Sequence, residues 1–166
     1  MGLFQRLFGN GAPDGFTGSL ENDETVIAHA PVQTGGHIVV TSLGLWVPGD
    51  EPRRIGWHLI SKVKWEGALR VVEAVEASVE GPVVLLEDLP AQRFALDDPR
   101  RVLRAISQRV EGSIRERERV ESPGVWILQR KIPGRDGVVW QARGDAGVDL
   151  GAVREAVSVF ASKLAG

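Results

Sequence analysis

Short β-compatible segments separated by turn residues run from residue 25 to residue 96, and they limit the folds open to this chain. The segments carry β-branched, leucine and tryptophan residues, and Gly, Pro or Asp residues lie in the turns between them. A spacing of about 8–15 residues between such strands is typical of an antiparallel meander that curls into a barrel or sandwich. The expected strands are 25–32, 37–47, 54–65, 69–75, 83–87 and 92–96.

The pattern changes from strands to a helix after residue 96. Asp98 is positioned to cap free helix amides, and Pro99 suits a first helical position. Apolar residues then recur at helical spacing: Val102, Leu103, Ile106, Val110 and Ile114. We expect a helix that ends between Arg115 and Arg119.

A β-β-α unit follows. Residues 125–132 and 138–143 are expected strands around a Gly-rich turn, and Asp149 is the expected cap of a second helix. The buried face of that helix would comprise Leu150, Val153, Val157, Phe160 and Leu164. Because this unit is small, we expect it to pack on the first unit and share its core. The prediction is an α+β protein with a segment at 1–19, a domain at 20–122 and the β-β-α unit at 123–166.

The first unit resembles the bacterial PH-like (pleckstrin-homology) and GRAM-like domains over residues 20–118. The resemblance lies in residues 24–27 and 37–46, in the strand at 54–63, and in residues 94–99 leading into a helix. It implies a PH-like antiparallel β-barrel capped by a helix, acting as a binding module. The first hairpin, residues 32–37, lacks the Lys and Arg of phosphoinositide-binding members. The use of Arg, Val, Ala and Gly is typical of high-GC actinobacterial proteins.

Composition argues against most enzyme chemistry. The chain has no Cys and no Tyr, which excludes thiol nucleophiles, thiolate metal sites and catalytic phenols. The three histidines lack the close spacing usual in zinc sites. Neither a nucleophile elbow nor a phosphate-binding P-loop is present. We therefore expect no catalytic residue, no cofactor and no metal, and a protein that is not an enzyme.

Charge is divided unevenly along the chain. Residues 1–98 hold 7 basic and 14 acidic residues, whereas residues 99–166 hold 13 and 8. Seven arginines are expected along the first helix: Arg100, Arg101, Arg104, Arg109, Arg115, Arg117 and Arg119. We select as partner-binding residues Arg100, Arg101, Arg104, Arg130, Lys131 and Arg135, with a solvated helix face as the alternative. The expected partner is a protein, because no aromatic set for stacking nucleic-acid bases accompanies these cations.

The first nine residues place Leu3, Phe4, Leu7 and Phe8 on one face of a short helix. Either this segment folds back on the domain or is disordered, or its apolar face anchors the protein to a membrane or a partner. The chain has no apolar run of about 20 residues that would span a bilayer and no secretory signal. We expect a cytoplasmic binding or scaffold module, with peripheral attachment to the inner face of the membrane as the alternative.

Overall fold

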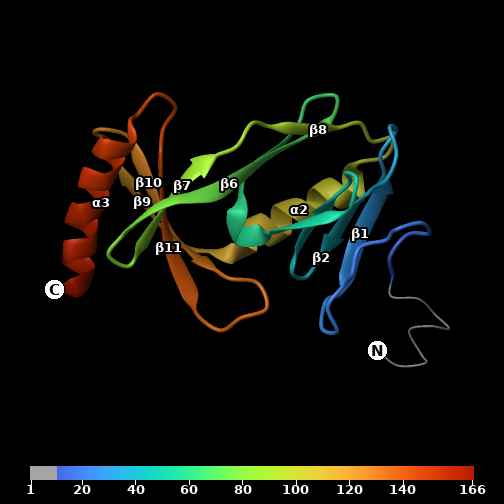
Figure 1. Cartoon of the computed structure of the whole chain (residues 1–166), viewed down its shortest axis with the longest axis horizontal. Helices are drawn as coiled ribbons and strands as arrows, with labels where there is room; N and C mark the ends of the chain where they lie inside the picture. Colours follow the sequence, from blue (N-terminus) through green and yellow to red (C-terminus); the bar gives the residue numbers. More distant parts are fainter. Residues whose placement is uncertain (1–10) are drawn as a thin grey trace.

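The computed structural model describes residues 11–166 and has an α+β architecture, as the sequence predicts (Figure 1). The first part of the chain holds β1 (Val26–Pro31), β2 (His37–Thr41), β3 (Gly44–Val47), β4 (Arg53–Gly56), a 3-10 helix η1 (Trp57–Leu59), β5 (Ile60–Trp65), β6 (Leu69–Glu80), β7 (Val83–Asp88), β8 (Gln92–Phe94) and α2 (Arg100–Ser113). The second part holds β9 (Ile114–Val120), β10 (Val125–Lys131), β11 (Val138–Gly144) and α3 (Leu150–Ala165).

Two sheets organise the described chain. The first is antiparallel with strand order β1-β2-β3-β4, and the second has the order β5-β6-β7-β11-β10-β9, with β8 also paired to β6. Strand β6 pairs with β5 and β8 through its first half and with β7 through its second half. Strand β11 joins β7 in parallel, so the C-terminal strands extend a sheet that begins in the first part of the chain.

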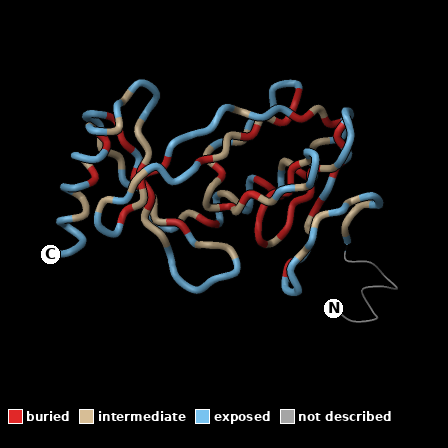
Figure 2. Tube along the Cα trace, viewed as in Figure 1, coloured by how far each residue is buried: buried red, intermediate tan, exposed pale blue. Residues whose placement is uncertain are grey.

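The buried apolar residues form two clusters (Figure 2). The second cluster joins Val83 and Leu85 of β7 to residues of β10, β11 and α3, so the C-terminal unit packs on part of the first unit. Helix α2 covers the first cluster, where Val102 and Ile106 are each 1% exposed. Helix α3 covers the second, where Val157 is fully buried. A strand of 12 residues extends about 40 Å, which is more than one helix of ordinary length covers. Each helix therefore closes its own part of the structure.

Two predicted strands are interrupted by side-chain contacts. The strand expected at 37–47 breaks after Thr41, whose Oγ1 accepts hydrogen bonds of 3.2 Å from the backbone amides of Leu43 and Gly44. The strand expected at 54–65 is divided by η1, where the buried Trp57 donates from Nε1 to the Thr41 carbonyl at 3.0 Å. Side chains that bond to the backbone compete with a continuous strand, and hydrophobic patterning does not reveal them.

The first helix ends earlier than predicted. It stops at Ser113, whose Oγ donates to the Val110 carbonyl at 2.7 Å, and strand β9 begins at Ile114 and pairs with β10. Arg115, Arg117 and Arg119 therefore lie on a strand and not on the helix. The predicted cap is also wrong, because Pro99 occupies the cap position and Asp98 makes no capping hydrogen bond.

The segment that precedes β1 is held by a buried carboxylate. The Glu24 side chain is fully buried and accepts hydrogen bonds from Thr41 Oγ1 at 2.5 Å, Trp46 Nε1 at 2.9 Å and Arg54 Nη1 at 2.7 Å. Burial alone would raise the pKa of Glu24. The hydrogen bonds from Thr41, Trp46 and the Glu21 amide, together with the charge of Arg54, outweigh it and hold that pKa below its usual value.

Candidate functional site

The six predicted partner-binding residues lie in different environments. Five are exposed: Arg100, Arg101 and Arg104 on the first turns of α2, Lys131 at the end of β10 and Arg135 in the loop that follows. Arg130 is only 3% exposed. Its assignment as a surface residue is therefore wrong, and its role lies inside the molecule.

Arg130 joins the two parts of the chain through backbone carbonyls. Its Nη2 donates to the Trp57 carbonyl at 2.6 Å, and its Nη1 donates to the carbonyls of Ile60 at 3.0 Å and His58 at 3.3 Å. Its Nε and Nη2 also donate to Ser113 Oγ, at 3.1 and 2.8 Å. One side chain on β10 thus fixes η1, the start of β5 and the end of α2.

Arg130 carries its charge without a carboxylate partner among residues 11–166. Burial lowers its pKa to about 10, and the charges of Arg143 and Arg117 act in the same direction. Glu111 acts in the opposite direction, but it is bound to Arg117 at 2.7 Å. Because the pKa remains well above 7, the guanidinium stays positive at neutral pH.

His58 lies in the same positively charged environment as Arg130. Burial is the main cause that lowers the pKa of His58, and the positive charges of Arg130 and Arg135 lower it further. The backbone carbonyl of His58 accepts from Gln141 Nε2 at 2.8 Å. Two buried atoms in this group, His58 Nδ1 and Gln141 Oε1, have no hydrogen-bond partner within the described chain. The imidazole is therefore neutral near pH 7 and adds no second positive charge beside Arg130.

A pocket of about 400 Å³ opens where the two parts of the chain meet, and we call it the junction pocket. Three cations line it, Arg109 from α2, Arg115 from β9 and Lys131 from β10, and no carboxylate lines it. Trp57 and Ser113 also line it. Since both residues accept hydrogen bonds from Arg130, the buried charge lies directly behind the pocket wall.

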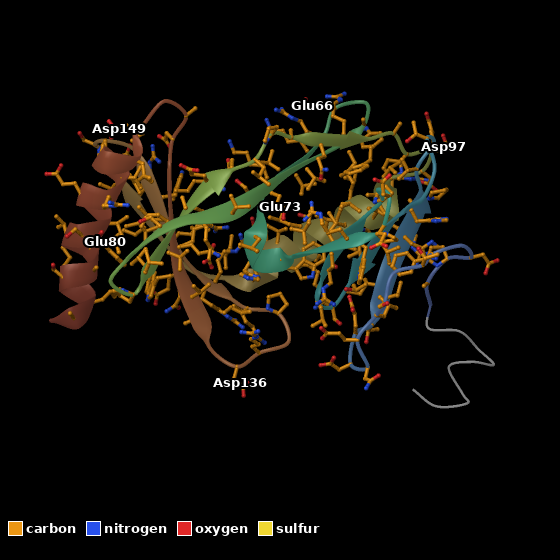
Figure 3. The ribbon with its side chains drawn as sticks, in the orientation of Figure 1. Glu66, Glu73, Glu80, Asp97, Asp136 and Asp149 are labelled. Atoms are coloured by element: carbon orange, nitrogen blue, oxygen red, sulfur yellow. The ribbon has the colours of Figure 1, made fainter. Side chains whose placement is uncertain are left out.

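The loop between β10 and β11 closes one side of the junction pocket. Gly134 lines the pocket with φ +73°, and a Cβ there would lie 2.9 Å from the Leu43 side chain. A glycine therefore suits both the backbone conformation and the close approach. Asp136 lies at the tip of this loop and points outward (Figure 3). The acidic residue of the loop therefore leaves the pocket's positive charge unopposed.

Three ion pairs separate the paired cations of the basic stretch from the free ones. Arg117 is bound to Glu111 at 2.7 Å and Arg119 to Asp145 at 2.5 Å. Arg100 lies 3.6 Å from Asp98. The remaining four are exposed and form no ion pair within residues 11–166, and we call them the arginine face: Arg101, Arg104, Arg109 and Arg115.

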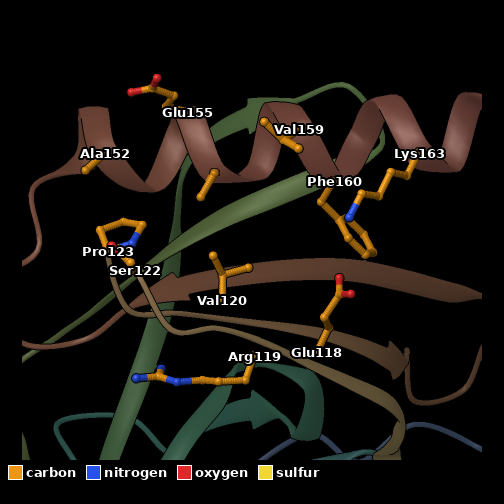
Figure 4. Close-up of a pocket in the computed structure, with 11 residues that line it drawn as sticks. Glu118, Arg119, Val120, Ser122, Pro123, Ala152, Glu155, Val159, Phe160 and Lys163 are labelled. Carbon is orange, nitrogen blue, oxygen red and sulfur yellow. The ribbon is translucent and has the colours of Figure 1, made fainter.

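A second groove lies between β9 and α3, with a volume of about 560 Å³ (Figure 4). Apolar side chains such as Val120, Val159 and Phe160 line it together with charges of both signs, including Glu155 and Lys163. Mixed charge does not select one class of ligand. The junction pocket, where all the charged side chains are cationic, is the more specific site.

Sequence reasoning found the basic stretch but not its geometry. Arg109 and Arg115 belong to the stretch, yet they were not among the six selected residues. Trp57 and Ser113 carried no sequence signal, because their role depends on how η1 and the end of α2 meet Arg130. The apolar residues Leu3, Phe4, Leu7 and Phe8 lie outside the described residues.

Neither α2 nor α3 combines the length and apolar character that a bilayer span requires. Among residues 11–166, no group of three or more His, Asp or Glu side chains is arranged to hold a metal ion. Comparison with known proteins finds no matching family model, curated protein or solved structure.

Proposed function

We propose that this chain is a non-catalytic binding module whose arginine face docks on an acidic surface of a protein partner. The observation that supports this function is the set of four exposed arginines without ion pairs within residues 11–166. Three of them lie on α2, a helix of 14 residues that is about 21 Å long. Their guanidinium groups are planar donors suited to carboxylates of a partner.

We also propose that the first part of the chain is a PH-like domain. The order of the strands before α2, and the packing of α2 on β1, β2, η1 and β5, support this assignment. A binding role agrees with such a scaffold, although fold alone does not define function. The function rests on the arginine face and not on the fold.

A protein partner is favoured over nucleic acid by the surrounding charge. Glu116 and Glu118 alternate with the arginines of β9 and are exposed, and the chain as a whole has a net charge of −2. A phosphate backbone would be repelled by these carboxylates. A smaller acidic protein patch can contact the α2 arginines alone.

The test measures binding of an acidic Glu/Gly peptide to the wild type and to the double variant Arg101→Gln/Arg104→Gln. Removing two exposed charge contacts should weaken binding about fivefold. The matched control is Arg154→Gln/Lys163→Gln on α3, which removes two cations from another element and should bind as the wild type does. Equal loss in both double variants would contradict the proposal, and so would binding of duplex DNA or RNA without binding of the peptide.

A further inference from the structure

We propose that the junction pocket binds a small phosphate monoester or inorganic phosphate. This inference does not rest on the proposed protein partner, since it concerns a discrete anion site in the isolated chain. It begins from three cations on three different elements, Arg109, Arg115 and Lys131, around a space that no carboxylate enters. Like charges gathered in this way repel one another unless an anion lies between them.

The buried charge behind the pocket strengthens the argument. Arg130 donates to Ser113 Oγ and to the Trp57 carbonyl, and both residues form part of the pocket lining. A buried cation without a carboxylate partner is costly, and an anion in the adjacent pocket offsets that cost. Arg130 is therefore a fixed positive charge behind the pocket, held in place by its hydrogen bonds.

The charge and size of the pocket select the ligand class. A single carboxylate would neutralise one of three lining cations, whereas a phosphoryl group brings up to two negative charges and three acceptor oxygens. Arginine side chains match those oxygens with two parallel donors, and lysine adds a point charge. A volume of about 400 Å³ lies within the usual range for small-molecule sites, so the phosphate can carry a small organic group.

The backbone around the pocket also suits an anion. Gly112 and Gly134 line it, and a Cβ at Gly112 would meet no atom within 4 Å. The ligand can therefore approach the chain closely at this point. Phosphate should change the amide resonances of these two glycines and of Ser113.

The experiment titrates the full chain with inorganic phosphate and with glycerol 2-phosphate at constant ionic strength, and it measures affinity by calorimetry and the thermal midpoint by fluorimetry. Both ligands should raise the midpoint, because a ligand that binds only the folded state stabilises it. The two titrations distinguish the two possible ligands. Tighter binding of glycerol 2-phosphate than of inorganic phosphate identifies a phosphate monoester as the ligand, and equal or weaker binding identifies phosphate itself.

The variants Arg115→Gln and Lys131→Gln should each weaken phosphate binding about tenfold, as expected for loss of one charge-assisted contact. Both side chains are exposed, so the fold should be retained. The control is Arg101→Gln/Arg104→Gln on the same helix but outside the pocket, which should bind phosphate as the wild type does. Equal phosphate affinity in Arg115→Gln and the wild type would overturn the inference, as would a response to phosphate no larger than that to sodium chloride.

These outcomes are distinct from those of the proposed function. Weaker peptide binding in Arg101→Gln/Arg104→Gln with phosphate binding retained supports both proposals. Phosphate binding without any peptide binding supports the pocket and contradicts the protein partner. Peptide binding without phosphate binding supports the protein partner and contradicts the phosphate site in the junction pocket.

Discussion

Glu24 shows how a single side chain secures the segment before β1. Its carboxylate accepts hydrogen bonds from Thr41, Trp46 and Arg54 in a buried setting. Removing one charged partner of a buried network leaves the other donors unsatisfied. The variant Glu24→Gln should therefore lose about 2 kcal/mol of unfolding free energy at pH 7, measured by urea denaturation.

The contribution of Glu24 to folding stability should decrease as the pH is lowered. Because the pKa of Glu24 is lowered in the folded state, its contribution to stability is present above the unfolded pKa of about 4.5 and is lost as the pH falls through the folded pKa. The difference in stability between wild type and Glu24→Gln should shrink on acidification. Glu21→Gln is the control, because that exposed side chain pairs with Arg54 at 3.2 Å and should cost less than about 1 kcal/mol. An equal effect of the two variants at pH 7 would contradict the buried network.

Arg130 has a different role from the one assigned by sequence. Replacing it by Met removes the donors for the carbonyls of Trp57, His58 and Ile60, and several buried acceptors without partners should cost about 3 kcal/mol or more. Lys131→Met is the neighbouring control and should change stability by less than about 0.5 kcal/mol. Chemical denaturation of both variants measures the contrast, and similar stability would contradict a structural role for Arg130.

His58 provides an independent readout of the same charge. Its pKa is lowered first by burial and then by Arg130 and Arg135, so NMR titration should place it below 6.5. The neutral form favoured by the fold contributes stability that is present above pH 6.5 and is lost as the pH falls through the folded pKa. In Arg135→Gln, which leaves the buried contacts intact, the His58 pKa should rise toward its usual value. An unchanged pKa would show that the charge of the loop does not reach His58.

At the scale of elements, patterning predicts the helix that has a clear apolar face. Asp149 caps α3 as expected, with its side chain accepting from the Ala152 amide at 2.9 Å, and Val153 and Val157 are buried. Leu164, the last residue of the predicted face, lies in the last turn of α3 and is 42% exposed. The interior of α3 was therefore predictable and its end was not.

Strand β9 shows what patterning misses. Its sequence alternates Arg and Glu from Arg115 to Arg119, and that period of two contains no apolar side to mark a strand. The apolar stripe of the preceding helix continues to Ile114, so the helix was extended too far. Pairing with β10 decides the conformation, and tertiary contacts of this kind are absent from local propensity.

The second buried apolar cluster is covered by α3, and two valines of this helix test whether the cluster depends on it. Val157 is fully buried and Val159 is 59% exposed on the same helix. Val157→Ala should cost about 2 kcal/mol because it leaves a cavity, whereas Val159→Ala should change stability by less than about 0.5 kcal/mol. Thermal unfolding followed by circular dichroism measures the effect. Equal effects would mean that α3 does not cover this cluster.

At the scale of the whole molecule, the excess of basic residues in the second part of the sequence produces a basic region on the surface of the fold. The basic residues after residue 99 were predictable as a stretch, but their division into paired, buried and free cations depends on where β9 and β10 lie. Arg117 and Arg119 are neutralised, Arg130 is enclosed, and the arginine face remains unpaired within residues 11–166. The sequence therefore locates the basic stretch, and only the structure separates its paired, buried and free cations.

The most direct test of the arginine face as the partner-binding surface is an NMR titration of the isotope-labelled chain with the acidic Glu/Gly peptide. We expect the largest amide shifts to cluster on α2 and the start of β9, around Arg101, Arg104, Arg109 and Arg115, and to fade as salt increases. Shifts centred on α3 or on the β1–β4 sheet, or no shifts at low salt, would contradict the arginine face as the partner-binding surface.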